Sequence, residues 1–115
     1  LQLRLMIDVK GNPDTCVGAV DLYQLDPRNR RAGVGIAIEE HERRNGHGLA
    51  ALTLLSDYAF GHLGLHQIWA EVPASNGESV ALFQQAGFEQ KGHLDQWVWR
   101  GTEWHDALWM HKIAK

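Results

Sequence analysis

The spacing of the apolar residues changes along this chain, and that change limits the folds open to it. Over residues 1–9 apolar side chains fall at every second position, which predicts a strand with one covered face. From Gly48 onward they fall three and four positions apart, which predicts an amphipathic helix. A chain that begins with strands and then alternates helices with strands is typical of a mixed α/β domain.

The other elements follow from the same patterns and from the turn residues between them. Turn clusters at 10–14 and 26–30 separate three early strands, which should form an antiparallel meander. Gly61 and Gly64 are expected to end the long helix. The expected order is β-β-β-α-β-α-β-β, with strands at 1–9, 15–25, 31–38, 66–72, 89–100 and 104–113 and helices at 48–63 and 77–86.

Length, charge and cysteine content exclude several classes of protein. With 115 residues, the chain has room for one domain, residues 1–115. No apolar run approaches the roughly 20 residues that cross a bilayer. The formal net charge of -3 argues against a broad nucleic-acid-binding face. Cys16 is the only cysteine and cannot form an intrachain disulfide, which favours a reducing compartment, the cytoplasm. We therefore expect neither a membrane nor a nucleic acid as partner.

The most informative stretch is Arg-Arg-Asn-Gly-His-Gly at residues 43–48, between the third strand and the long helix. A helix N-terminus presents unpaired N–H groups and the positive end of the helix dipole, which together attract phosphate. Gly46 and Gly48 would let the backbone approach such an anion, and Arg43 and Arg44 add charge beside it. The alternatives are a plain glycine-rich helix start and a dinucleotide fingerprint of the form G-x-G-x-x-A. Antiparallel strands before the loop argue against the fingerprint, which follows a parallel strand.

Two motifs together resemble those of the GCN5-related N-acetyltransferase (GNAT) superfamily. Arg43-x-x-Gly46-x-Gly48 matches its acetyl-CoA signature, Q/R-x-x-G-x-G/A, and residues 76–88 are similar to N-x-x-S/A-x-x-L/I-Y/F-x-x-x-G-F. The resemblance is closer to the spermidine N-acetyltransferases and the enzymes that acetylate ribosomal-protein N-termini. It implies a mixed, mostly antiparallel sheet of the acyl-CoA N-acyltransferase type.

The start of the chain differs from the family pattern. Family members begin with a strand and two helices that cover the substrate, and nothing here corresponds to them. The chain opens at Leu1 within a strand pattern, without Met and without a basic and apolar leader. We therefore expect an N-terminally incomplete domain that carries no signal peptide.

The resemblance implies acetyl-CoA as co-substrate. In the family a strand edge pairs with the pantetheine arm, one of its backbone N–H groups polarises the acetyl oxygen, and a loop wraps the pyrophosphate. Taken alone, residues 36–38 would be a plain buried strand and Asn76 a turn or helix cap. The residues expected to bind acetyl-CoA are Ile36, Ala37, Ile38, Arg43, Arg44, Asn45, Gly46, His47, Gly48, Asn76 and Phe83.

In the reaction that the resemblance implies, a primary amine attacks the thioester directly in a ternary complex. Phe83 stands where many relatives have a Tyr that protonates the leaving thiolate. Ser79 matches the Ser that relatives acting on ribosomal-protein N-termini use, with Tyr58 and water as alternatives. Asp21 and Glu71 are the candidates to accept a proton through water or to attract the cationic amine. The structural alternatives are a small residue in a first helical turn for Ser79 and solvated charges for the two carboxylates.

The acceptor stays open between a peptide or protein N-terminus and a polyamine, and a small-molecule amine is a further alternative. Ser79 with Phe83 favours the peptide N-terminus. Gly33 and Gln24 stand where spermidine enzymes would carry carboxylates, which counts against a polyamine. From a different class, a non-catalytic acyl-CoA-binding or regulatory domain would account for the missing Tyr.

Two further groups of residues allow several interpretations. Trp97, Trp99, Trp104 and Trp109 predict a core, an interface with a second copy in a homo-oligomer, or an aromatic acceptor pocket. His62 and His66 are four positions apart, but a glycine at the end of the helix separates them and no cysteine pair completes a zinc set. We therefore expect no metal.

Overall fold

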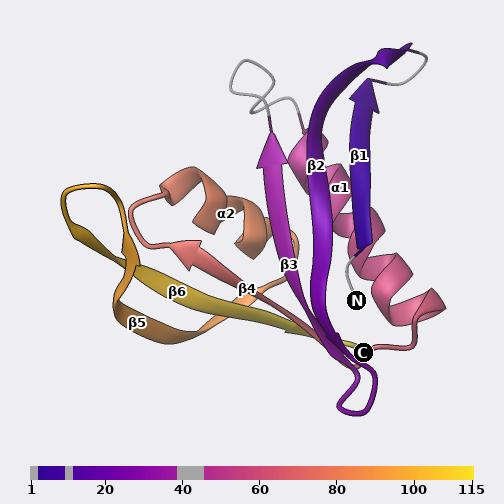
Figure 1. Ribbon diagram of the computed structural model, residues 1–115. Helices are drawn as coiled ribbons and strands as arrows, with labels where there is room; N and C mark the ends of the chain where they lie inside the picture. Colours follow the sequence, from indigo (N-terminus) through magenta and orange to yellow (C-terminus); the bar gives the residue numbers. More distant parts are fainter. Residues whose placement is uncertain (1–2, 10–11, 39–45) are drawn as a thin grey trace.

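The computed structural model describes residues 3–9, 12–38 and 46–115 (Figure 1). Its strands form one sheet in the order β1-β2-β3-β4-β6-β5, antiparallel throughout except between β3 and β4. This confirms the predicted mixed, mostly antiparallel sheet and the predicted order of elements. The elements are β1 (Leu3–Val9), β2 (Asn12–Asp26), β3 (Arg31–Ile38), α1 (His47–Asp57), η2 (Tyr58–His62), β4 (Gln67–Pro73), α2 (Gly77–Gln85), β5 (Glu89–Trp99) and β6 (Trp104–Ile113).

Some predicted boundaries need correction. Asn12, Pro13 and Asp14, expected in a turn, belong to β2, which makes its pairing with β1 longer. Gly61 does not end the long helix, because it lies inside η2, a π-helical turn that continues α1. The helix ends before Gly64, whose φ of 67° is in the left-handed region that glycine adopts readily. No helix formed by the described residues combines the length and apolarity needed to cross a bilayer.

Both helices pack on one face of the sheet, and the alternation of side chains along the strands explains why. In β2, Val20 and Leu22 are each 2% exposed and belong to the core, whereas Asp21 and Tyr23 point to the other side. The core joins alternate strand residues to Leu52 and Leu55 of α1 and to Phe83 of α2, among others. In Figure 1, α1 lies behind the first strands. We call the side opposite the helices the open face, because no helix of the described residues covers it.

The parallel pairing of β3 with β4 is short, and this shapes the site. It runs over three residue pairs, from Arg31 opposite Gln67 to Gly33 opposite Trp69. Beyond them β3 stays paired with β2 as far as Ile38, and β4 stays paired with β6 as far as Pro73. The two strands therefore diverge (Figure 1), and each leaves one edge unpaired within the described part of the chain. This opening is called the splay below.

Candidate active site

The beginning of α1 lies against α2 and the end of β3. A Cβ atom built on Gly48 would stand 3.0 Å from Cδ2 of Leu82 in α2 and 3.7 Å from Cδ1 of Ile36 in β3. Because a methyl group here would press on Leu82, a glycine lets the two helices approach closely. Three elements that the sequence connects to cofactor binding therefore meet beside the splay.

The first turn of α1 begins at a glycine, which has no side chain of its own to cap the helix. Gly46 is the N-cap residue, with φ of 81°, and its carbonyl accepts the Ala50 N–H at 3.1 Å. A non-glycine residue is strained in this left-handed conformation, which accounts for the glycine. His47 follows as the first helical residue and is half-buried. The predicted phosphate ligands Arg43, Arg44 and Asn45 lie outside the described residues.

The edge of β3 at the splay offers backbone groups. Alternate residues of a strand direct their N–H and C=O groups to opposite edges, so about half of those beyond Gly33 face the opening. The Ile36 side chain packs against the core and Ala37 is exposed on the open face. The side chain of Ile38 lies outside the description. An extended chain with amide groups could pair with this edge.

The start of α2 contributes Asn76 and Ser79. Asn76 caps the helix, because its Oδ1 accepts the Ser79 N–H at 3.1 Å. The Ser79 hydroxyl has no hydrogen-bond partner among the described residues and is half-buried. Phe83 is 3% exposed, with its ring edge-to-face on Phe88 at 5.0 Å. Its visible role is packing, and a contact of Phe83 or Asn76 with a cofactor stays a prediction.

The two predicted carboxylates differ in their partners on the open face. Both oxygens of Asp21 accept from Arg4, at 2.8 and 3.1 Å, so this carboxylate is neutralised by a bidentate ion pair. Glu71 accepts one hydrogen bond, from the Trp97 indole N–H at 3.0 Å. Because the indole N–H is neutral, this hydrogen bond does not balance the negative charge of Glu71. The geometry therefore favours Glu71 over Asp21 as the group that meets an amine.

Tyr23 belongs to the same surface, although we did not single it out from the sequence. Burial raises the pKa of Tyr23 above 10.0, and the negative charges of Glu71 and then Asp21 raise it further. The phenol therefore stays protonated and lies within electrostatic reach of both carboxylates. The signal was present in β2, where residues 21 and 23 share a face by simple alternation.

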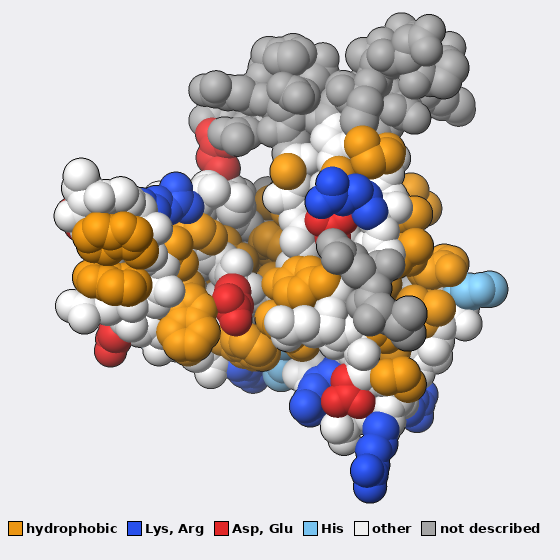
Figure 2. Space-filling view, viewed as in Figure 1, with side chains coloured by type: hydrophobic (Ala, Val, Ile, Leu, Met, Phe, Trp, Pro, Cys, Tyr) orange, Lys and Arg blue, Asp and Glu red, His pale blue; other side chains and the backbone are white. Residues whose placement is uncertain are grey.

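An aromatic wall extends from Tyr23 across β4 to β6. Tyr23 meets Trp69 edge-on at 5.4 Å between ring centroids, and Trp69 stacks on Trp109 at 4.6 Å. Beside the wall lies a cavity of about 470 Å³, lined by Gln24, Asp26, Arg31, Gln67, Trp69, Glu71 and Trp109. In Figure 2, a red carboxylate stands among orange side chains over the middle of this face. Aromatic faces next to a carboxylate suit a cationic amine.

The four tryptophans near the C-terminus do not form one cluster. Trp109 is half-buried in the aromatic wall, whereas Trp97, Trp99 and Trp104 are 52%, 54% and 55% exposed. The prediction that they form a core is wrong for these three. Trp99 and Trp104 pair at 5.2 Å near the tip of the β5–β6 hairpin, where orange side chains gather in Figure 2.

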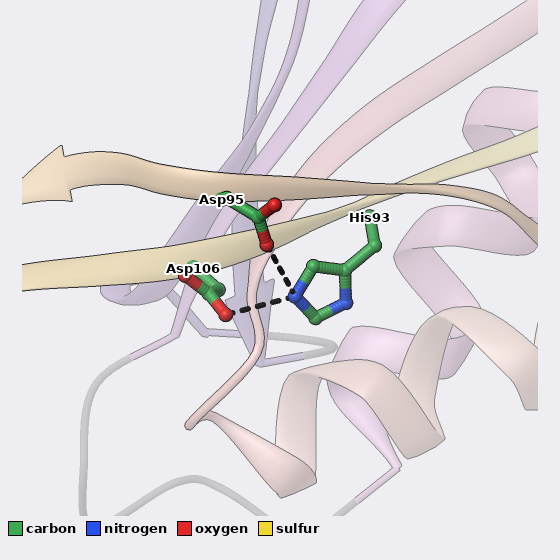
Figure 3. A group of neighbouring side chains, drawn as sticks. All are labelled: His93, Asp95 and Asp106. Carbon is green, nitrogen blue, oxygen red and sulfur yellow. Dashed lines mark hydrogen bonds and ion pairs between the residues drawn. The ribbon is translucent and has the colours of Figure 1, made fainter.

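A histidine and two aspartates meet on the β5–β6 hairpin (Figure 3). His93 Nε2 lies 2.8 Å from Asp106 Oδ2 and 3.5 Å from Asp95 Oδ1. Among the described residues this is the one group of three potential metal ligands that the structure brings together. The hydrogen bond to Asp106 raises the pKa of His93, so the group also holds together as an ion-pair triad. Spacing along the chain does not predict this group, because its residues come from two strands.

His62 and His66, the two histidines four positions apart in the sequence, do not belong to this group. His62 stacks on Tyr58 at 4.8 Å in η2, and it is not part of the three-ligand group. That packing engages Tyr58 as an aromatic partner on the helix surface. The expectation that the reaction uses no metal stays a prediction.

Comparisons with known proteins agree with this geometry. Spermidine N(1)-acetyltransferase of Vibrio cholerae is 27% identical over 95 residues, which cover 83% of this chain and 55% of that protein. A putative ribosomal N-acetyltransferase of Bacillus subtilis, YdaF, is 26% identical over 98 residues, 85% of this chain and 54% of that protein. The chain thus spans about half the length of these relatives.

Solved structures and a family model point the same way. The structure of the V. cholerae spermidine N-acetyltransferase in complex with CoA and spermine superposes with a TM-score of 0.88 at 26% identity, covering 97% of this chain and 65% of that one. The model of the acetyltransferase (GNAT) domain matches residues 2–89. The two motifs, the splayed sheet and this match lead to one conclusion: the chain belongs to the GNAT acetyltransferase family.

Proposed function

We propose that this chain transfers an acetyl group from acetyl-CoA to a primary amine by direct attack in a ternary complex. The observation that carries the proposal is the splay between β3 and β4, with the start of α1 packed against the end of β3 and against α2 beside it. We take residues 1–115 as a single N-acetyltransferase domain. The proposal rests on this arrangement and on membership of the family.

The residues present fit acetyl-CoA. The unpaired edge of β3 at Ile36, Ala37 and Ile38 suits the amide groups of pantetheine. Gly46 has no side chain to compete for the N–H groups at the start of α1, which suits a phosphate. We assign the pyrophosphate to these groups together with Arg43, Arg44, Asn45, His47 and Gly48, and a pantetheine hydrogen bond to Asn76.

The amine is expected to approach from the open face, where Glu71 and the aromatic wall lie. Glu71 attracts the ammonium form and accepts a proton through water, which gives the neutral nucleophile. The amine nitrogen then forms a bond to the acetyl carbon as the carbon–sulfur bond breaks, and the nitrogen releases its second proton to water. The Ser79 hydroxyl, which has no hydrogen-bond partner among the described residues, donates a proton to the departing thiolate and regains one from water. Asp21, whose charge is balanced by Arg4, is the second candidate carboxylate for the role of Glu71.

Two acceptor classes agree with the names of the relatives. One similar protein is named for spermidine and another for the ribosome, so a polyamine and a protein N-terminus both stay in the proposal. Ser79 with Phe83 favours the N-terminus. A structure of the V. cholerae enzyme is described as dodecameric, which supports a homo-oligomer here. The lone cysteine of the chain favours the cytoplasm.

Calorimetric titration with acetyl-CoA, with NADH as control ligand, tests the proposal on the natural protein that carries this chain. We expect saturable binding of acetyl-CoA alone, and a rise in Kd of at least about tenfold in Gly46→Glu. The matched control is Gly61→Glu, which adds the same charge on η2, where a Cβ atom meets nothing within 4 Å. A folded protein that ignores acetyl-CoA, or binds NADH equally well, would contradict the proposal.

The second candidate is a non-catalytic domain that binds an acyl-CoA. It is favoured by Phe83, which lacks the hydroxyl of a tyrosine and is buried. Binding of acetyl-CoA without acetylation of peptides, spermidine or spermine would support this candidate over the enzyme.

A further inference from the structure

Trp97 reaches Glu71 across an intervening strand. The sheet order is β4-β6-β5, so β6 separates the strand of Glu71 from that of Trp97. Two strand spacings amount to about 9 to 10 Å, which regular side chains standing upright on a sheet do not span. The indole N–H of Trp97 nevertheless donates to Glu71 Oε2 at 3.0 Å. A departure from regular strand geometry in β5 must therefore direct the Trp97 side chain toward β4.

A bulge in β5 accounts for this change of direction. Leu94 pairs with Ala107 and Val98 with His105, so four steps along β5 match two steps along β6. The extra length falls on residues 95–97. Gln96 has φ of 49°, which is uncommon for a residue with a side chain and marks a local departure from the extended strand.

The carboxylate of Asp106 holds the bulge from the facing strand. Its Oδ1 accepts the Gln96 N–H at 2.9 Å, and its Oδ2 lies 2.8 Å from His93 Nε2 (Figure 3). Its own carbonyl accepts the Ala74 N–H at 2.9 Å, which ties this point of β6 to the segment after β4. One side chain thus fixes the strained residue that immediately precedes Trp97.

Glu71 gains a fixed orientation from this arrangement. An exposed glutamate has many rotamers, and ordering it when a ligand binds costs conformational entropy. With Oε2 engaged by Trp97, the carboxylate is held over β4, and Oε1 accepts no hydrogen bond from the residues that the structure describes. We propose that Trp97 is a positioning residue that orients Glu71 toward the acceptor amine. The β5 bulge, which Asp106 holds in place, brings the Trp97 side chain within hydrogen-bonding distance of Glu71. This inference rests on the proposed acetyl transfer.

Steady-state kinetics of the natural protein with a spermidine or peptide acceptor provide the test. Trp97→Phe keeps an aromatic ring and removes the N–H, so we expect KM for the amine to rise about tenfold. KM for acetyl-CoA should stay unchanged. Trp99→Phe is the matched control, because Trp99 lies on the same strand with the same exposure and pairs with Trp104 instead.

A double-mutant cycle separates positioning from general damage. In the Glu71→Gln background, Trp97→Phe should have less than half its effect in the unaltered protein, since neighbouring groups are not additive. Asp106→Ala, which removes the acceptor of the Gln96 N–H, should reproduce the defect of Trp97→Phe and add little to it. Equal effects of Trp97→Phe in both backgrounds, or an unchanged KM for the amine, would overturn the inference.

Two further results are decisive. If EDTA treatment of the unaltered protein produced the defect of Asp106→Ala, the triad would act through a metal and direct support of the bulge would be wrong. If the unaltered protein bound acetyl-CoA and acetylated no amine, the proposed function would fall, and the inference with it. Turnover with a normal amine KM in Trp97→Phe overturns the inference alone.

Discussion

A Cβ atom on Gly33 would stand 2.7 Å from Cε2 of Tyr23, closer than real Cβ contacts allow. The same atom would lie 2.9 Å from Cη2 of Trp69. Gly33 is also the last β3 residue that pairs with β4. Gly33 thus lets two rings close over the strand at the apex of the splay.

Gly33→Ala should therefore destabilise the fold by about 1–3 kcal/mol, the usual cost of forcing a methyl group into a packed site. Chemical denaturation measures this as a lower midpoint. Gly35→Ala is the control on the same strand, because its Cβ would lie 3.6 Å from Tyr23, in ordinary contact. Equal stability of the two variants would mean that the rings move aside freely.

The sequence predicted those parts of the fold that local patterns encode. The bounds of β3 and β6 match, and turn residues mark where each of the two strands begins. The cap at Asn76 follows from its place before a helix. These features depend on neighbours along the chain.

The rest of the candidate site depends on which strands become neighbours. No local pattern places β6 between β4 and β5, so the contact of Trp97 with Glu71 could not be read from spacing. The bulge likewise needs Asp106 from the facing strand. Asp21 looked equivalent to Glu71 in the sequence, and the pairing of β1 with β2, which brings Arg4 to it, separates them.

Tyr23 reports on the charge of Glu71. Its pKa lies above 10.0 because of burial first, then the negative charges of Glu71 and Asp21. We expect the absorbance titration of the unaltered protein, minus that of Tyr23→Phe, to give a phenolate midpoint above 10.0. In Glu71→Gln the midpoint should fall toward 10.0, since one repelling charge is removed. An unchanged midpoint would mean that the charge of Glu71 does not act on Tyr23 in solution.

The stability of the β5–β6 hairpin should depend on pH through His93 and Asp106. The hydrogen bond to Asp106 raises the pKa of His93 above 6.5, so this contribution is complete below 6.5 and is lost as pH rises through the folded-state value. The Gln96 N–H and then His93 lower the pKa of Asp106 below 3.8, so its contribution is present above 3.8 and is lost in stronger acid.

The stabilisation by this pair is therefore greatest between the two ordinary values. We expect the denaturation midpoint of the unaltered protein to exceed that of His93→Gln at about pH 6, and the difference to shrink by about pH 8.5. Subtracting the variant removes the titration of the other histidines. Asp95→Asn is the control, because that carboxylate stands farther away, at 3.5 Å. A difference that grows with pH would contradict the assigned pairing.

Ser79→Ala tests the proposed acid without disturbing α2. The Asn76 cap uses the backbone N–H of residue 79, which alanine retains, so the helix should keep its stability. Loss of proton donation should lower kcat by about 10²-fold while the Kd for acetyl-CoA stays unchanged. Asn76→Ala is the contrasting variant, because it removes the cap and should cost about 1 kcal/mol of stability. A Ser79→Ala protein with normal kcat would leave Tyr58 or water as the proton donor, since Phe83 has no hydroxyl to offer.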